Sequence, residues 1–309
     1  MANANYIFLL SLTVIFISFL IKKAGILSED DGKVIAKVVL NVTLPALILE
    51  VFSNIEIYPT LVLLPFIAFG FSLLVSAFTY VSYRKYPMRY RGLMMMVSVG
   101  FNIGLFAYPL IRGIWGEIGM EYIIMFDLGN SFVVFILSYT LGSFYSPKIK
   151  PHTEKFNAKT IIKRVFSSVP LITLFIALII NLSGIILPLL LTDLLDILSR
   201  ANMALTLLTL GIFIDFQFDK SHWKYVIQVL FTRYGFGLLV GIPLLFVLPF
   251  GLEYNALILV GLILPIGMSS IPFAVEFGYD EKLASTMVNL TNIFSFILMW
   301  IIVLILGIG

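Results

Sequence analysis

The chain has 309 residues, of which 60% are apolar and 12% are charged, and its formal net charge at pH 7 is +3. Soluble domains carry charge on about 25% of their residues, so this composition excludes a large soluble domain and indicates a membrane protein. The chain has no cysteine, which excludes disulfides, zinc–thiolate sites and thiol catalysis, and its two histidines, His152 and His222, form no ligand pair.

Ten apolar segments follow one another along the chain, each close to the ~20 residues that a membrane-spanning helix needs. They lie near residues 5–21, 33–53, 57–83, 88–113, 118–144, 160–182, 189–214, 222–248, 254–277 and 282–307. The first is not a cleaved signal peptide, because Lys22 and Lys23 follow the apolar run instead of preceding it. Short segments can be re-entrant, so nine or eleven spans stay open as alternatives.

Basic residues predict the orientation, because cytoplasmic loops of membrane proteins are enriched in lysine and arginine. Of the 20 basic residues, only Arg112 lies on the opposite side, and Arg200 and Arg233 fall within spans. We therefore expect a plasma-membrane protein with both termini outside, which requires an even number of spans. The basic charge is a topology signal, and a nucleic-acid partner is not expected.

The ten segments divide into two sets of five, residues 1–145 and 160–309, around a basic loop at 146–159 that we place in the cytoplasm. Because five is odd, the two halves enter the bilayer from opposite sides. The predicted fold is therefore an all-α membrane protein built from two inverted five-helix repeats, a common plan of secondary transporters.

A shared motif interrupts one helix in each half. The fourth segment contains FNIGLFAYP at 101–109, and the ninth contains LPIGMSSIP at 264–272. The shared residues are Ile103, Gly104 and Pro109 in the first half and Ile266, Gly267 and Pro272 in the second. One such segment alone would suggest a kink or a close-packing site. A matched pair favours two broken helices that cross near mid-membrane and mark the binding site.

The predicted site follows from backbone chemistry. A break frees N–H and C=O groups that cannot face lipid, and the N–H groups at a helix N-terminus suit a carboxylate. Asn102 would add a side-chain donor, and Leu105 is expected to face lipid. Asn41 and Thr43, near Pro45, line the site or lie at a simple kink. The candidate binding residues are Asn102, Ile103, Gly104, Pro265, Ile266, Gly267, Ser269, Ser270, Asn41, Thr43, Asn130 and Asn292.

Charged and polar residues at membrane depth are usually functional. Asp127, one helical turn from Asn130, is expected to couple protons or to support the structure. The second half contains a similar but weaker pair, Asn289 and Asn292, which are also polar and three residues apart on one helix face. Glu276 has either a coupling role or a solvated place at a helix end.

Four further charged residues have simpler interpretations. Asp196 and Arg200 are expected to neutralise each other across one helical turn. Arg233 is expected to snorkel or to attract an anion, and Glu50 to reach water.

These motifs resemble the auxin efflux carrier family, within the superfamily of bile-acid:sodium symporter-like proteins. The resemblance rests on GFNIGLFAYPLIRGIWGEIGMEYIIMFDLGN at 100–130 and FGYDEKLASTMVNLTNIFS at 277–295. It implies an elevator-type secondary carrier of small organic anions, auxin-like or a dicarboxylate such as malate or malonate. It also implies a homodimer, with spans one, two, six and seven as scaffold and the other six as a mobile core. The third span lacks an acidic residue and the break reads FNIG, so auxin itself is not implied.

Other functions remain as alternatives: a sodium-coupled symporter of the bile-acid type, a passive channel and a membrane sensor. No cofactor is expected beyond a coupling H⁺ or Na⁺. An enzyme is not expected, because no nucleophile or ligand cluster has suitable spacing, and the absence of a P-loop excludes direct ATP drive by this chain.

Overall fold

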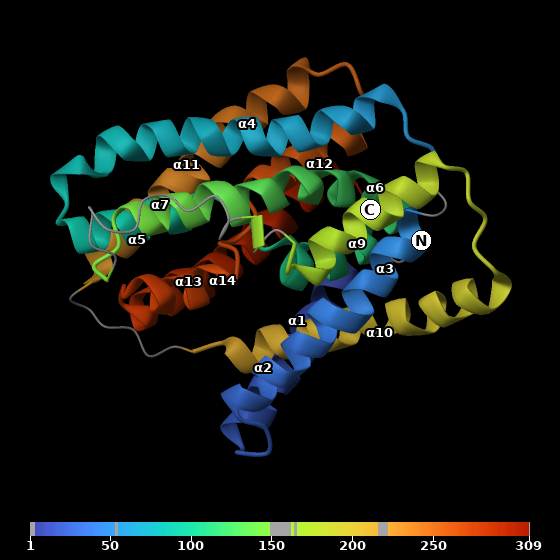
Figure 1. The fold of residues 1–309 in the computed structure, drawn as a ribbon, viewed down its shortest axis with the longest axis horizontal. Helices are drawn as coiled ribbons and strands as arrows, with labels where there is room; N and C mark the ends of the chain where they lie inside the picture. Colours follow the sequence, from blue (N-terminus) through green and yellow to red (C-terminus); the bar gives the residue numbers. More distant parts are fainter. Residues whose placement is uncertain (1–3, 53–54, 149–161, 164–165, 216–221, 309) are drawn as a thin grey trace.

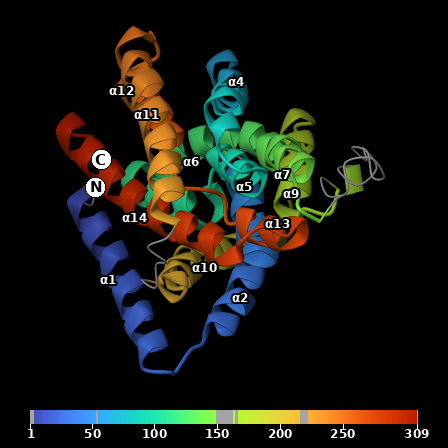
Figure 2. The ribbon, with the colours of Figure 1, turned by 90° about the vertical axis from the view of Figure 1, so that its left-hand side faces the viewer.

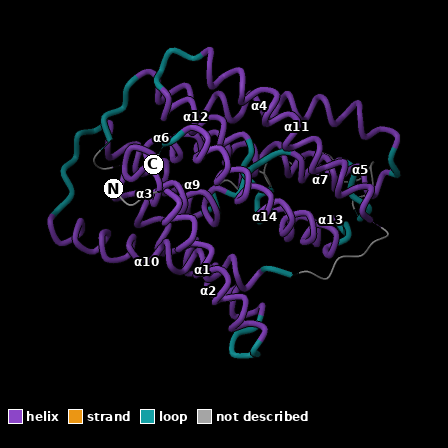
Figure 3. Tube along the Cα trace, turned by 180° about the vertical axis from the view of Figure 1, so that it is seen from behind, coloured by secondary structure: helices purple, strands orange, loops and turns teal. Residues whose placement is uncertain are grey.

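The computed structural model describes residues 4–52, 55–148, 162–163, 166–215 and 222–308, and every regular element in these ranges is helical (Figures 1 and 3). Much of the predicted loop at 146–159 lies outside the described residues. The main helices are α1 (Ala4–Lys23), α2 (Glu29–Val38), α3 (Leu44–Phe52), α4 (Pro59–Ser82), α5 (Met88–Ser98), α6 (Tyr108–Phe132), α7 (Tyr139–Phe144), α9 (Val169–Leu182), α10 (Leu189–Phe213), α11 (Trp223–Val247), α12 (Leu252–Leu262), α13 (Ser270–Phe277) and α14 (Glu281–Leu306). Short π-helical segments join α2 to α3 (Val39–Thr43), lead into α6 (Ile103–Ala107) and join α6 to α7 (Val133–Ser138).

Seven helical stretches of the described chain are long and apolar enough to cross a bilayer, which makes this a multi-pass membrane protein. They are Ala4–Lys23, Glu29–Phe52, Pro59–Lys85, Ile103–Phe144, Leu189–Phe213, Trp223–Val247 and Glu281–Leu306, and α9 and α12 are shorter apolar helices. The longest stretch is divided at Gly116, whose φ of 59° only glycine adopts readily. Gly116 lies between the predicted fourth and fifth segments.

Helix ends follow local sequence signals. Ser28 caps α2: its hydroxyl accepts a hydrogen bond from the Asp31 backbone N–H at 3.2 Å, and the Asp31 carboxylate accepts one from the Ser28 N–H at 2.8 Å. Asp280 caps α14 by accepting from the Leu283 N–H at 3.0 Å. Both caps satisfy a backbone N–H that the first helical turn leaves unpaired, which explains why the helices begin there.

The helices pack as two groups that meet along α6 and α10. In the first group α10 lies against α1, α2 and α3, and α3 lies against α9; in the second α4 packs on α6 and α11 on α12. Figure 2 shows α1 and α2 diverging from their shared turn, with α10 between them. Contacts of α6 with α1, α3 and α10 join the two groups.

Two glycines allow the closest approaches between helices. A Cβ at Gly129 in α6 would clash with the backbone carbonyl of Pro65 in α4, and a Cβ at Gly211 in α10 would clash with the carbonyl of Ile15 in α1. Small residues at such crossings let backbones touch where no hydrophobic force drives helices together in lipid.

The two ends of the chain lie together. The indole Nε1 of Trp300 in α14 donates a hydrogen bond to Asn5 Oδ1 in α1 at 2.8 Å, and the termini are adjacent in Figure 1. The loops after α9 and before α4 lie at the same end of the molecule as the termini, whereas the turn between α4 and α5 lies at the opposite end (Figure 1).

Candidate functional site

The first break lies between α5 and α6. Helix α5 ends at Ser98, Val99 is extended, and Gly100 has a φ of 77°. The chain returns to helical geometry at Ile103. Gly100 therefore turns the chain where a residue with a Cβ would be strained.

The second break lies between α12 and α13. Helix α12 ends at Leu262 and α13 begins at Ser270, and Pro265 in between lacks a backbone N–H. The Asn102 backbone N–H donates to the Pro265 carbonyl at 2.9 Å. The two interrupted segments are thus in direct contact, although they are far apart in the sequence.

Asn130 holds the first break in place. Its Oδ1 accepts from the Phe101 N–H at 2.8 Å, and its Nδ2 donates to the Phe101 carbonyl at 3.1 Å and to Asp127 Oδ1 at 3.0 Å. The Tyr108 hydroxyl donates to the other oxygen of Asp127 at 2.8 Å. Asp127 is 8% exposed, so these two bonds satisfy a carboxyl group that has little access to water.

Thr291 and Ser295 in α14 hold the second break. Thr291 Oγ1 accepts from the Ile266 N–H at 3.1 Å, and Ser295 Oγ donates to the Ile263 carbonyl at 2.7 Å. Tyr234 of α11 donates to the Thr291 carbonyl at 2.9 Å. The sequence analysis singled out Asn289 and Asn292 instead, and it missed this pair. Thr291 and Ser295 lie four residues apart and so share one helix face, but their spacing does not show which backbone groups that face meets.

Arg233 lies in α11 behind both breaks and is 4% exposed. Its guanidinium donates to five backbone carbonyls at 2.7–3.2 Å, those of Val97, Ser98, Gly100, Leu264 and Pro265. It also lies over the Phe101 ring, 5.0 Å from the centroid. The expectation that Arg233 snorkels to the membrane surface is wrong, because the carbonyls freed by the breaks provide a nearer set of acceptors.

Asn102 is the candidate donor at the contact between the breaks. It is 4% exposed, and its Nδ2 has no hydrogen-bond partner among the described residues. A buried amide without a partner costs free energy. Its neighbours Ile103 and Ile266 are buried, and Gly104 packs against Leu44 and Leu40.

The remaining candidates are spread around the breaks. Thr43 is buried, and its hydroxyl accepts from Asn202 Nδ2 at 3.1 Å. Asn41 is exposed and donates to the Lys37 carbonyl at 2.7 Å, so its amide is used within its own helix.

Ser270 is buried at the start of α13, and Ser269 is half-buried. Asn292 is half-buried, and its Oδ1 has no partner within the described ranges.

The surroundings of Leu105 and Glu276 differ from each other and, for Leu105, from the expected ones. Leu105 is 4% exposed and packs in the core, so it does not face lipid. The π-helical geometry at 103–107 changes the face on which each side chain lies. Glu276 is exposed near the end of α13 and accepts a hydrogen bond from the Tyr139 hydroxyl at 2.8 Å.

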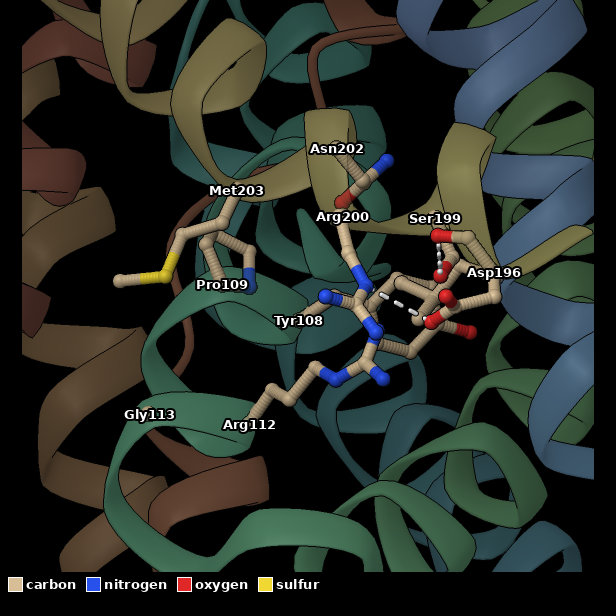
Figure 4. A pocket seen from close by; sticks show the side chains of 10 residues that line it. Tyr108, Pro109, Arg112, Gly113, Asp196, Ser199, Arg200, Asn202 and Met203 are labelled. Atoms are coloured by element: carbon tan, nitrogen blue, oxygen red, sulfur yellow. Dashed lines mark hydrogen bonds and ion pairs between the residues drawn. The ribbon is translucent and has the colours of Figure 1, made fainter. Parts of the chain in front are cut away.

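A cavity of about 430 Å³ opens beside the first break. Its lining includes Tyr108 and Pro109, which follow the break directly, and Asn202 of α10 (Figure 4). The whole lining is Leu47, Tyr108, Pro109, Arg112, Gly113, Asp196, Ser199, Arg200, Asn202 and Met203.

Two arginines border this cavity, and both have acidic partners. Arg200 Nε pairs with Asp196 Oδ1 at 2.8 Å, which confirms the expected neutralisation. Arg112 Nη2 lies 3.2 Å from Glu50 and 3.1 Å from Glu117. Glu50 is therefore held in an ion pair and does not simply reach water, as its place in the sequence had indicated.

These features define an all-helical membrane protein whose interrupted helices touch in its interior. A model of the family described as membrane transport protein matches residues 7–303. The chain therefore belongs to this family, that of the auxin efflux carriers, and is a transporter and not an enzyme.

Two archaeal relatives agree with this assignment. The chain is 26% identical to an uncharacterized transporter of Methanothermobacter thermautotrophicus over 305 residues, which cover 95% of this chain and 96% of the relative. It is also 26% identical over 305 residues to an uncharacterized transporter of Methanocaldococcus jannaschii, with 93% and 94% covered.

Proposed function

We propose that this transporter is a secondary active carrier of small organic anions, carboxylates in particular, which bind where the two breaks meet. The observation that carries the proposal is Asn102, whose buried Nδ2 lies beside the contact between the breaks and has no partner in the part of the chain that the structure describes. The first turn of the helical segment that starts at Ile103 leaves further N–H groups unpaired by the helix itself. Such groups, with the helix dipole, favour a negatively charged ligand.

The proposed topology is ten spans in two inverted five-helix repeats, residues 1–145 and 160–309, in the plasma membrane with both termini outside. The positions of the two breaks support this plan, because each lies in the fourth span of its half. The adjacency of the termini supports an even number of spans.

The proposed mechanism is elevator-type alternating access in a homodimer. The packing supports a division into two bodies: one group of helices surrounds α10, and the other contains both breaks. The second group would move as the mobile core, with the breaks and the substrate travelling together. The cavity beside Tyr108 and Pro109 would then be the route from the outer side to the breaks.

Asp127 is the proposed coupling residue for protons. It is buried one helical turn from Asn130, which holds the first break. A change in its protonation would alter the hydrogen bonds to Tyr108 and Asn130 and so the geometry of the break. Glu276, which is exposed near the end of α13, stays a second candidate for the coupling role.

The test is solute flux in proteoliposomes that contain the purified chain. A panel of mono- and dicarboxylates is offered with and without a pH gradient. We expect saturable uptake of at least one carboxylate that a pH gradient drives uphill. Non-saturable flux without coupling would indicate a passive channel, and no flux of any carboxylate would contradict the proposal.

A further inference from the structure

Arg233 provides a cation at the place where the two breaks meet. One guanidinium nitrogen donates to three carbonyls at the end of α5 and the first break, Val97, Ser98 and Gly100, at 3.0–3.1 Å. The other donates to Leu264 and Pro265 of the second break, at 2.7 and 3.2 Å. A single side chain therefore satisfies backbone acceptors from both interrupted segments.

The position of Arg233 makes its charge important for stability. It lies about 15 Å along α11 from the first residue of that helix, which is about half the thickness of a hydrocarbon core. No ion pair joins it to an acidic group in the described part of the chain. The charge is instead stabilised by carbonyl dipoles and by the face of Phe101.

Carbonyls in this arrangement are ligands for small cations. In interrupted membrane helices, unwound carbonyls and the C-terminal ends of half-helices coordinate Na⁺. The guanidinium of Arg233 is protonated and planar. Its two terminal nitrogens donate to all five carbonyls, and its Nε has no partner among the described residues. The guanidinium thus supplies both the charge and the geometry that such a set of oxygens requires.

We propose that Arg233 is a built-in cation that holds the two breaks together in place of a bound sodium ion, so that neither folding nor transport of this chain depends on sodium. The statement about transport rests on the proposed carrier function, whereas the statement about folding does not. The proposal also argues against a sodium-coupled symporter.

The first test is thermal unfolding of the purified full-length chain in detergent, followed by tryptophan fluorescence. The wild type is measured in NaCl, KCl and choline chloride at equal ionic strength. We expect the same midpoint in all three salts. A saturable rise of the wild-type midpoint in NaCl relative to choline chloride would overturn the proposal, whatever the variants do.

The second test removes the charge in two ways. Arg233→Ala opens a space lined by the five carbonyls, and we expect its midpoint in choline chloride to fall by roughly 5 °C or more. Saturating Na⁺ should restore part of this loss by entering the space. Arg233→Met fills the space without a charge, so it should lose stability without recovery in Na⁺. Arg200→Ala, which removes an exposed arginine, should change little in any salt.

The outcomes separate this proposal from the carrier function. An Arg233→Ala midpoint equal to that of the wild type, or a loss that Na⁺ does not reverse, would overturn the proposal. If the variant does not fold, the wild-type salt comparison decides. Uptake of a carboxylate that is equal in sodium and choline gradients supports the transport statement, and uptake that requires sodium overturns it. Lack of all flux contradicts the carrier function and leaves the stability result valid.

Discussion

At the scale of single residues, the two breaks are held by different side chains that perform the same task. Asn130 binds the Phe101 backbone through both ends of its amide, whereas Thr291 and Ser295 divide the task between two hydroxyls. Both arrangements satisfy peptide groups that would otherwise be unpaired within the membrane, where each costs several kcal/mol. The polar side chains around the breaks are therefore structural partners first. Among the described residues, Asn102 Nδ2 and Arg233 Nε are buried donors at the breaks without a partner, and only Arg233 serves the backbone through its other donors.

Replacing Asn102 by alanine should weaken substrate binding without weakening the fold. Its Nδ2 has no partner to lose within the described residues, so we expect the unfolding midpoint to be nearly unchanged. A hydrogen bond to a charged ligand contributes about 1.5–3 kcal/mol, so carboxylate affinity of the purified protein should fall roughly 10- to 150-fold. Unchanged affinity in Asn102→Ala would remove this residue from the binding site.

Replacing Asp127 by asparagine should reduce transport and abolish its dependence on a pH gradient. The amide nitrogen cannot accept from Tyr108 or Asn130, so one of these hydrogen bonds is lost, at a cost of about 1–3 kcal/mol in stability. The matched control is Tyr108→Phe, which removes one of the same bonds but keeps the carboxyl group. A pH-driven rate in Asp127→Asn equal to that of the wild type would exclude this residue from coupling.

At the scale of helices, close contacts depend on glycines whose neighbours are backbone atoms. Gly129→Ala places a Cβ against the Pro65 carbonyl, which no rotamer change can relieve. We expect a loss of roughly 1–3 kcal/mol in stability from overpacking of α4 against α6. Gly70→Ala is the matched control, because nothing lies within 4 Å of its added Cβ and alanine favours the helix. Thermal unfolding of both variants checks the difference, and equal midpoints would mean that α4 and α6 are not packed this closely.

Close packing at the first break can also be tested by adding a side chain to a glycine. Gly104→Val should damage transport, because a Cβ there lies 2.9 Å from Leu44 Cδ2 and has to displace it. The control position is Leu74 of α4, which is exposed. Leu74→Val should leave the uptake rate within about twofold of the wild type. If both variants transport equally well, close packing at the first break is not needed for function.

At the scale of the whole molecule, the distribution of basic residues predicts the orientation. Pro147 lies in the basic loop at 146–159 and is exposed, and Ile186 lies between α9 and α10 with 92% of its surface exposed. Because the chain has no cysteine, each position can be labelled alone. A membrane-impermeant thiol reagent applied to intact cells should modify Ile186→Cys and spare Pro147→Cys until the membrane is permeabilised. The reverse pattern would invert the proposed topology.

The sequence by itself determined the features that depend on local composition. Long apolar runs can satisfy their peptide groups in lipid only as helices, and glycine and proline weaken helices, as Gly100 and Pro265 do at the two breaks. The class of protein, the places of both interruptions and the family resemblance were therefore readable without coordinates. The pairing of Asp196 with Arg200 was readable too, because it spans a single helical turn.

The tertiary structure alone decided which side chains serve the breaks. Arg233 is more than 130 residues from Val97, Ser98 and Gly100, and no spacing rule connects them. Leu105 was assigned to lipid and is buried, because helical periodicity does not continue through a break and a π-helical turn. Thr291 and Ser295 were missed because short hydroxyl side chains are common in membrane helices, and only the approach of another backbone shows which of them have acceptors and donors to satisfy. Contacts between segments distant in the sequence depend on how the helices cross, and hydropathy does not encode that geometry.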